Sequence, residues 1–149
     1  MNSIQKLELE ATELFKQKEY SKVVFEITSQ TKEEQRSTLL CNLLGLSRII
    51  NNKRNKDALT LAIKDFKTGY LKKENTPNSL DSLANFITTN VLLIDLENNH
   101  DFDFSEIINF YEMSEKICQN HRPINLAMAM VFRRLNDAKK LIFHFKKII

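Results

Sequence analysis

Apolar residues recur every three or four positions over most of the chain, and polar stretches separate the apolar runs. This spacing places the apolar side chains along one face of a helix. With only two glycines and two prolines, the chain also has little of the turn chemistry that a protein with many β-hairpins needs. We therefore predict an all-α chain of eight helices in one domain. The helices pair into hairpins at approximately 3–30, 32–72, 79–119 and 123–149.

Capping residues locate several of the helix boundaries. Ser3 can cap the first helix through its hydroxyl. Thr31 and Glu34 have the spacing of a capping box, which predicts that the third helix starts near Lys32. The clearest break in the first half of the chain is 72–78, because it contains a proline.

Small residues recur at corresponding positions of the four predicted first helices. They are Ala11, Gly45, Thr88 and Ala129. Each predicted second helix carries two larger or apolar residues four positions apart. These pairs are Val23 with Ile27, Ala62 with Phe66, Ile107 with Tyr111, and Leu141 with Phe145. Two intervals, from Ala11 to Gly45 and from Ile107 to Leu141, are 34 residues long, which is the tetratricopeptide period.

The chain therefore resembles the tetratricopeptide repeat (TPR) family over nearly its whole length. The two middle hairpins are longer than the family pattern, so we expect longer first helices or wider turns there. A bundle of helices without repeats is the alternative, because any helical hairpin shows similar apolar spacing.

The resemblance implies an α-α superhelix of about four hairpins whose first helices line a concave face. Such a face binds a protein or peptide ligand, so partner binding is the implied function. By register, the partner-binding residues would be Asn42, Leu46, Ile49, Asn85, Thr89, Leu92, Leu126, Met130 and Arg133. For Leu46, Ile49 and Leu92, a place in the core of lengthened helices is the alternative.

The last hairpin is expected to offer a second packing surface. No polar helix follows to cover its apolar residues, and solenoids need such caps. The expected C-terminal packing surface comprises Phe132, Leu141, Phe145 and Ile148. A downstream domain, a second copy in a homo-oligomer, or a partner would cover it. The chain is then either free-standing or the N-terminal module of a longer protein, and bacterial proteins that it resembles suggest a role as an accessory to a transferase.

Residues with catalytic or metal-binding chemistry are few. Cys118 and His121 form one C-x-x-H pair, but zinc needs about four ligands and no second pair follows. The acidic segment at 101–106 lacks the glycine of a calcium loop. We predict no catalytic residues, no metal and no cofactor, and therefore not an enzyme. A small metal-binding or enzymatic bundle that uses Cys118, His121 and the Asp101 region is the alternative.

The 22 basic and 19 acidic residues are scattered, which predicts no nucleic-acid partner. No apolar run approaches the roughly 20 residues of a membrane span, which predicts no membrane insertion. RNA or membrane-surface binding by the basic last hairpin is a further alternative, because it contains the pairs 133–134, 139–140 and 146–147. Two distant cysteines and an N-terminus without a secretory signal predict a cytoplasmic location.

Overall fold

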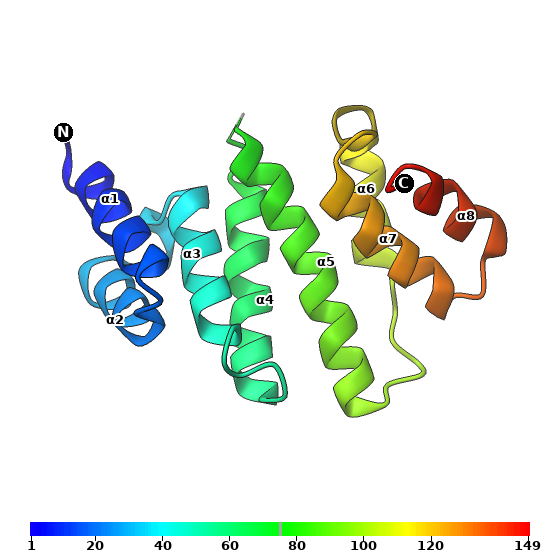
Figure 1. Cartoon of the computed structure of the whole chain (residues 1–149), viewed down its shortest axis with the longest axis horizontal. Coiled ribbons are helices and arrows are strands. Elements are labelled where there is room, and N and C mark those ends of the chain that lie inside the picture. Colours follow the sequence, from blue (N-terminus) through cyan, green and yellow to red (C-terminus); the bar gives the residue numbers. More distant parts are fainter. Residues whose placement is uncertain (75) are drawn as a thin grey trace.

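The computed structural model describes residues 1–74 and 76–149, and this part of the chain contains eight α-helices and no strand. The helices are arranged along the long axis, with the N-terminus at one end and the C-terminal helix at the other (Figure 1). The helices are α1 (Ser3–Lys16), α2 (Tyr20–Gln30), α3 (Thr38–Ile49), α4 (Lys56–Leu71), α5 (Pro77–Glu97), α6 (Ser105–Cys118), α7 (Arg122–Arg134) and α8 (Ala138–Lys146). The predicted all-α class and the eight helices are confirmed.

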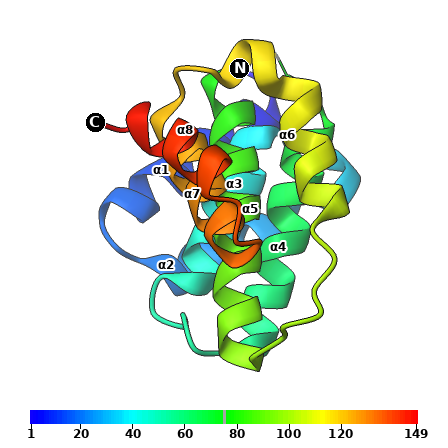
Figure 2. The same cartoon turned by 90° about the vertical axis from the view of Figure 1, so that its right-hand side faces the viewer.

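The hairpins contact one another in sequence order. The first helices α1, α3, α5 and α7 form a continuous series, each contacting the next, and α2 and α4 also pack against the first helix that follows. Stacked helical repeats contact their neighbours in this way. The second helices do not all lie on one side of the stack, because α4 and α6 are on one side of α3 and α5 while α2 is on the other (Figure 2).

Two groups of buried apolar residues hold the stack together. The larger group joins α3 to α7, and the smaller one joins α1, α2 and one side of α3. Helices α3 and α4 approach closely at Gly45, where an added Cβ atom would lie 2.5 Å from the Phe66 ring. The prediction of a small residue at a close helix contact is therefore confirmed at Gly45.

The third helix begins later than its capping signals predict. Helix α3 starts at Thr38, and the Ser37 hydroxyl accepts a hydrogen bond from the Leu40 amide. The Thr31 hydroxyl instead donates to the Ile27 carbonyl, at the end of α2. A short 3-10 helix, Glu33–Gln35, connects the two helices. The predicted start near Lys32 is wrong because Thr31 terminates the preceding helix.

The middle hairpins accommodate their extra residues in two ways. Between α3 and α4 the connection covers residues 50–55, whereas α5 itself is 21 residues long and is followed by a connection over 98–104. Within α5, Thr88 is half-buried, and Ala84 is the small residue that lies in the core. The predicted break at 72–78 separates α4 from α5 but extends into the first turn of α5, which Pro77 opens; Asn75 within it lies outside the described residues.

Candidate functional site

Asn42, predicted to face a ligand, is instead buried beneath the first turn of α5. Its side-chain amide donates to the Asn78 carbonyl at 2.9 Å, and its Oδ1 accepts from the Ser82 hydroxyl at 2.7 Å. The start of the long helix α5 covers this part of α3, a position that the repeat alignment assigned to the concave face. The prediction that Asn42 contacts a partner is wrong.

Ile49 and Thr89 are also buried. Ile49 belongs to the larger core group, against which the half-buried Leu46 and Leu92 also pack. The Thr89 hydroxyl donates to the Asn85 carbonyl within its own helix. At this turn Thr88 is the more exposed of the two threonines, so the predicted register is displaced by one residue. The partner-contact prediction is wrong for Ile49 and Thr89.

Apart from the half-buried Leu46 on α3, the predicted residues that are not buried lie on α5 and α7, on a surface we call the α5–α7 face. Its members are Asn85, Leu92, Leu126, Met130 and Arg133, of which Leu126 and Arg133 are exposed and the others half-buried. It combines an amide, three apolar side chains and a guanidinium. Such a surface can pair with peptide backbone and accept apolar side chains.

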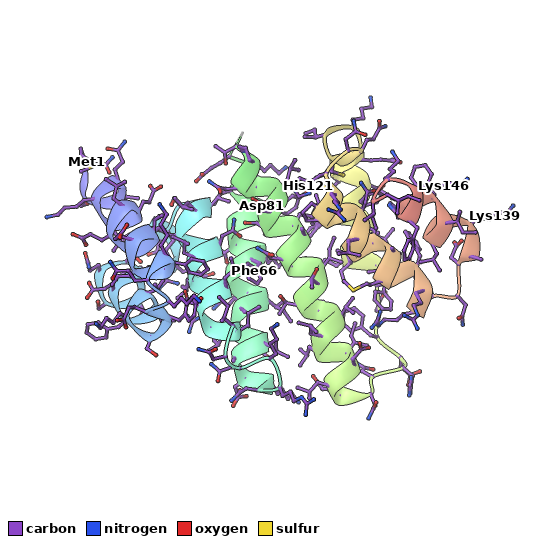
Figure 3. All side chains as sticks on the ribbon, viewed as in Figure 1. Met1, Phe66, Asp81, His121, Lys139 and Lys146 are labelled. Atoms are coloured by element: carbon purple, nitrogen blue, oxygen red, sulfur yellow. The ribbon has the colours of Figure 1, made fainter. Side chains whose placement is uncertain are left out.

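Two polar bridges fix α5 against α7 at the two ends of this face. At one end, His121 Nε2 lies 3.1 Å from Asp81 Oδ1 (Figure 3). Because His121 Nδ1 accepts from the Ile124 amide, Nε2 is the nitrogen that donates to Asp81. At the other end, the Arg134 guanidinium binds both carboxylate oxygens of Asp95.

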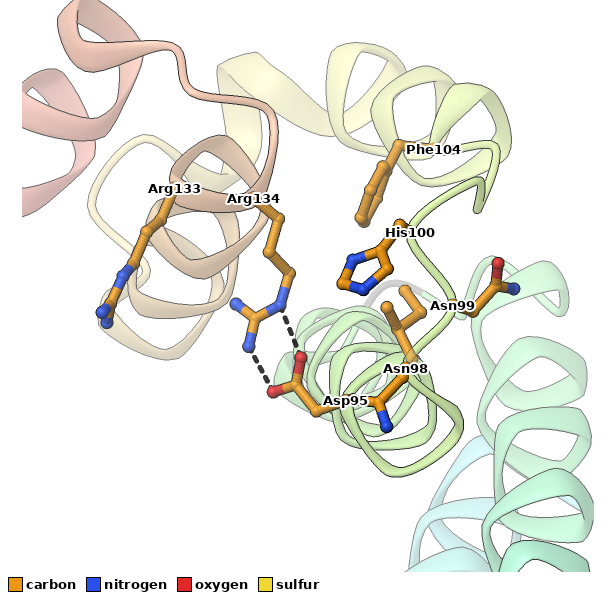
Figure 4. Close-up of a pocket in the computed structure, with 8 residues that line it drawn as sticks. Asp95, Asn98, Asn99, His100, Phe104, Arg133 and Arg134 are labelled. Carbon is orange, nitrogen blue, oxygen red and sulfur yellow. Dashed lines mark hydrogen bonds and ion pairs between the residues drawn. The ribbon is translucent and has the colours of Figure 1, made fainter.

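A polar cleft lies beside the second bridge, between the C-terminal ends of α5 and α7. It is lined by Ile94, Asp95, Asn98, Asn99, His100, Phe104, Arg133 and Arg134. Asp95 and Arg134 neutralise each other, and Arg134 also donates to the Met130 carbonyl at 2.8 Å. Figure 4 shows the Arg133 side chain directed away from His100 and Phe104. The charged groups of this cleft therefore serve helix packing or point outward.

The residues with candidate metal chemistry have separate structural roles. Cys118 is buried and its thiol donates to the Glu115 carbonyl, and burial raises the pKa of this thiol. His121 caps α7 and bridges to Asp81. Asp103 accepts hydrogen bonds from the Ser105 hydroxyl and amide, which lower the pKa of its carboxyl. Across residues 1–74 and 76–149, no three His, Cys, Asp or Glu side chains form a group able to hold a metal ion.

Helix α8 buries a histidine that sequence reasoning did not select. The His144 ring stacks on Phe132, with ring centres 5.5 Å apart, and meets Tyr111 edge-on. Its Nδ1 donates to Asn125 Oδ1 at 2.9 Å, because the Asn125 amide nitrogen already donates to the Gln119 and His121 carbonyls. Burial lowers the pKa of His144 to about 4, so the ring is neutral near pH 7.

Because α8 packs on α7 in this way, the four residues predicted to form the C-terminal packing surface differ in exposure. Phe132 is buried beneath His144, so the prediction that Phe132 contacts a partner is wrong. Leu141 and Ile148 are half-buried, whereas Phe145 is 52% exposed. The spacing of Leu141, His144 and Ile148 at three and four positions is the sequence signal that could have revealed the buried face.

The exposed side of α8 carries an apolar stripe formed by Ala138, Ile142 and Phe145. Ile142 is 53% exposed and Phe145 is 52% exposed. Their helical spacing of four and three residues places them along one side of the helix.

The residues of the α8 stripe have equivalents on α4 when the fourth hairpin is aligned with the second. Asp65 on α4 contacts Arg48 on α3 at 2.7 Å, and His144 on α8 contacts the corresponding residue of α7, Phe132. In this register, Phe145 is equivalent to Phe66, which is fully buried and lies against Gly45 of α3, in a hairpin that α5 also contacts. The fourth hairpin therefore presents a packing position that is buried in the second.

No helix in the described ranges combines the length and apolar character needed to cross a bilayer. Comparison with known proteins gives no match to a protein-family model, a curated protein or a solved structure. The resemblance to tetratricopeptide repeats accordingly stays a prediction from the sequence.

Proposed function

We propose that this chain is a noncatalytic helical repeat scaffold that binds another protein through the α8 stripe. The observation that carries the proposal is the exposure of Ile142 and Phe145, because the residue equivalent to Phe145 in the second hairpin is fully buried. Exposed apolar side chains at a position that packs elsewhere in the stack favour association with another surface.

The α5–α7 face supplies a second region where a peptide could bind. Asn85 offers an amide that can donate to and accept from an extended backbone, while Leu126 and Met130 provide apolar contact. The two polar bridges hold the helices in place, so this face needs little rearrangement on binding. It would extend the partner contact beyond α8.

A noncatalytic role is supported by the functions of the reactive side chains within the fold. Burial raises the pKa of Cys41 to about 12, which disfavours the nucleophilic thiolate. Cys118 is likewise buried, and His121 and His144 each support helix packing. The fold therefore uses these groups as structural residues.

The proposal is tested by affinity capture with the wild-type chain and the Ile142→Ser/Phe145→Ser variant. We expect the variant to lose the captured partners, because its apolar contact is removed. Phe25→Ser is the matched control, since Phe25 is 65% exposed on α2 at the opposite end. Each variant is first shown by circular dichroism to be folded.

An unchanged set of partners with the α8 variant would overturn binding through the stripe. An Asn85→Ala/Met130→Ala variant then shows whether the α5–α7 face binds instead. Light scattering of the purified chain measures self-association independently. A dimer that the α8 variant dissociates would identify a second copy as the bound protein.

A further inference from the structure

We infer that the α8 stripe binds an amphipathic helix of a partner protein that carries acidic residues along one flank. This inference rests on the proposed function and adds the shape and charge of the partner. The shape follows from the repeat geometry. The charge follows from the lysines beside the stripe.

A helix is the shape that this position accepts within the molecule. In the second hairpin, α4 presents Ile63 and Phe66 at the positions equivalent to Ile142 and Phe145, and α5 packs along α4. The α8 stripe has the three- and four-residue spacing that complements a helix of the same kind. An added helix would therefore occupy the place that α5 occupies beside α4.

Two lysines lie beside the stripe, in a segment that is mostly basic. Residues 122–149 contain seven of the 22 basic residues of the chain but only one of its 19 acidic residues. Lys140 and Lys147 lie over the rings of Phe132 and Phe143. Lys139 and Lys146, seven residues apart on one side of α8, are exposed and make no ion pair within the described part of the chain.

Figure 3 shows these two lysines at the α8 end of the stack. In the second hairpin, Lys67 is the residue equivalent to Lys146, and it forms an ion pair. Lys67 pairs with Glu106 of the following hairpin at 2.7 Å. An acidic residue on the docked partner would give Lys146 the same kind of contact, and Lys139 could bind a second one.

The α1 helix of a second copy fits this surface less well. The residues of α1 equivalent to Leu43 and Leu44 of α3 are Leu9 and Glu10, so its outer side is partly charged. Docking α1 would bury Glu10 against apolar side chains, which is costly. If two α8 helices packed against each other, their lysines would lie close together. This contact is unfavourable because like charges repel.

A membrane surface also fits less well than a helix. Phe143 and Phe145 lie about 200° apart around the helix, so both cannot enter a bilayer from one side. Phe143 instead packs edge-on to His144 and beneath Lys147. Phe143 is 49% exposed, but it lies on a different side of α8 from the stripe.

The test uses two stapled helical peptides with the same leucine stripe, one with glutamates and one with lysines along the flank. Binding to the full chain is measured by fluorescence anisotropy at low and high salt. We expect the glutamate peptide to bind at least about tenfold more tightly. In the Lys139→Glu/Lys146→Glu variant we expect the lysine peptide to bind more tightly than the glutamate peptide. In the Phe145→Ser variant we expect neither peptide to bind.

The possible outcomes separate the inference from the proposed function. Equal binding of both peptides, lost in Phe145→Ser, would overturn the acidic partner and leave the apolar docking site intact. Failure of both peptides would overturn helix docking itself. Binding to vesicles of phosphatidylserine and phosphatidylcholine that requires Phe145, without peptide binding, would assign the surface to lipid. A dimer that Phe145→Ser dissociates would assign it to a second copy.

Discussion

At the scale of single residues, His144 shows how the last hairpin tolerates a polar ring in its interior. Asn125 accepts its Nδ1 hydrogen, and Phe132 and Tyr111 enclose the ring. The neutral form is the one that this environment stabilises, because a charged imidazolium would lose its hydration there. His144 thus makes the packing of α8 on α7 sensitive to acid.

We expect the chain to lose stability as the pH falls from about 6.5 toward 4. The pKa of His144 is lowered from 6.5 to about 4 in the folded state, so the unfolded chain binds the additional proton in this window. The contribution is fully present above pH 6.5 and amounts to at most about 3 kcal/mol. Urea unfolding across this range measures it, with His144→Gln as the variant that lacks the titration. Parallel pH profiles of the two proteins would contradict this role of His144.

At the scale of elements, glycines allow α3, α4 and α5 to meet closely. Gly45 of α3 lies against the Phe66 ring, and a Cβ atom on Gly69 of α4 would lie 2.9 Å from both Cys41 Cβ and Ser82 Oγ. The Thr38 hydroxyl also donates to the Gly69 carbonyl at this junction. The two glycines therefore determine how near the three helices approach, although glycine is a weak helix former.

Replacing Gly45 by alanine is expected to lower the free energy of unfolding by about 1–2 kcal/mol. Alanine gains up to about 1 kcal/mol in helix propensity, but its methyl group would overlap a fully buried ring, and overpacking costs about 1–3 kcal/mol. Urea denaturation measures the difference, with the exposed Thr60→Ala on α4 as the control. A more stable Gly45→Ala protein would show that Phe66 can move aside.

At the scale of the whole molecule, the apolar interior is divided unequally. The first hairpin and α3 share a group of seven buried residues, whereas 21 buried residues join α3 to α7. In stacked repeats each unit depends on its neighbours, so the less extensive group stabilises its hairpin less. The first hairpin is therefore expected to open before the middle of the stack.

Hydrogen–deuterium exchange tests this expectation. We predict faster exchange for buried amides of α1 and α2 than for those of α4 and α5, because local opening costs least where few apolar residues are buried. Ile27→Ala should accelerate exchange in α1 and α2 while leaving α5 nearly unchanged. Uniform acceleration along the chain would instead indicate that the molecule opens as one cooperative unit.

Most of the fold could be predicted because helix formation is encoded locally. Apolar spacing located all eight helices, and polar segments located most of their ends. Thr31 was misassigned because a threonine hydroxyl can end one helix as readily as it caps the next. Asn42 and Thr89 were misassigned because their exposure depends on the length and rotation of α5 relative to α3, which residue spacing does not specify.

By itself, the sequence determined the all-α class, the number of the helices, and the small residue at Gly45, since these follow from periodicity and side-chain size. Only the tertiary structure decided which polar residues lie inside and which side of α8 stays open. Asn42 and His144 are buried because distant helices cover them and satisfy their hydrogen bonds. Phe145 is exposed, whereas Phe66, its equivalent in the second hairpin, is fully buried and lies against Gly45 of α3. Burial depends on neighbours that the chain brings together only on folding.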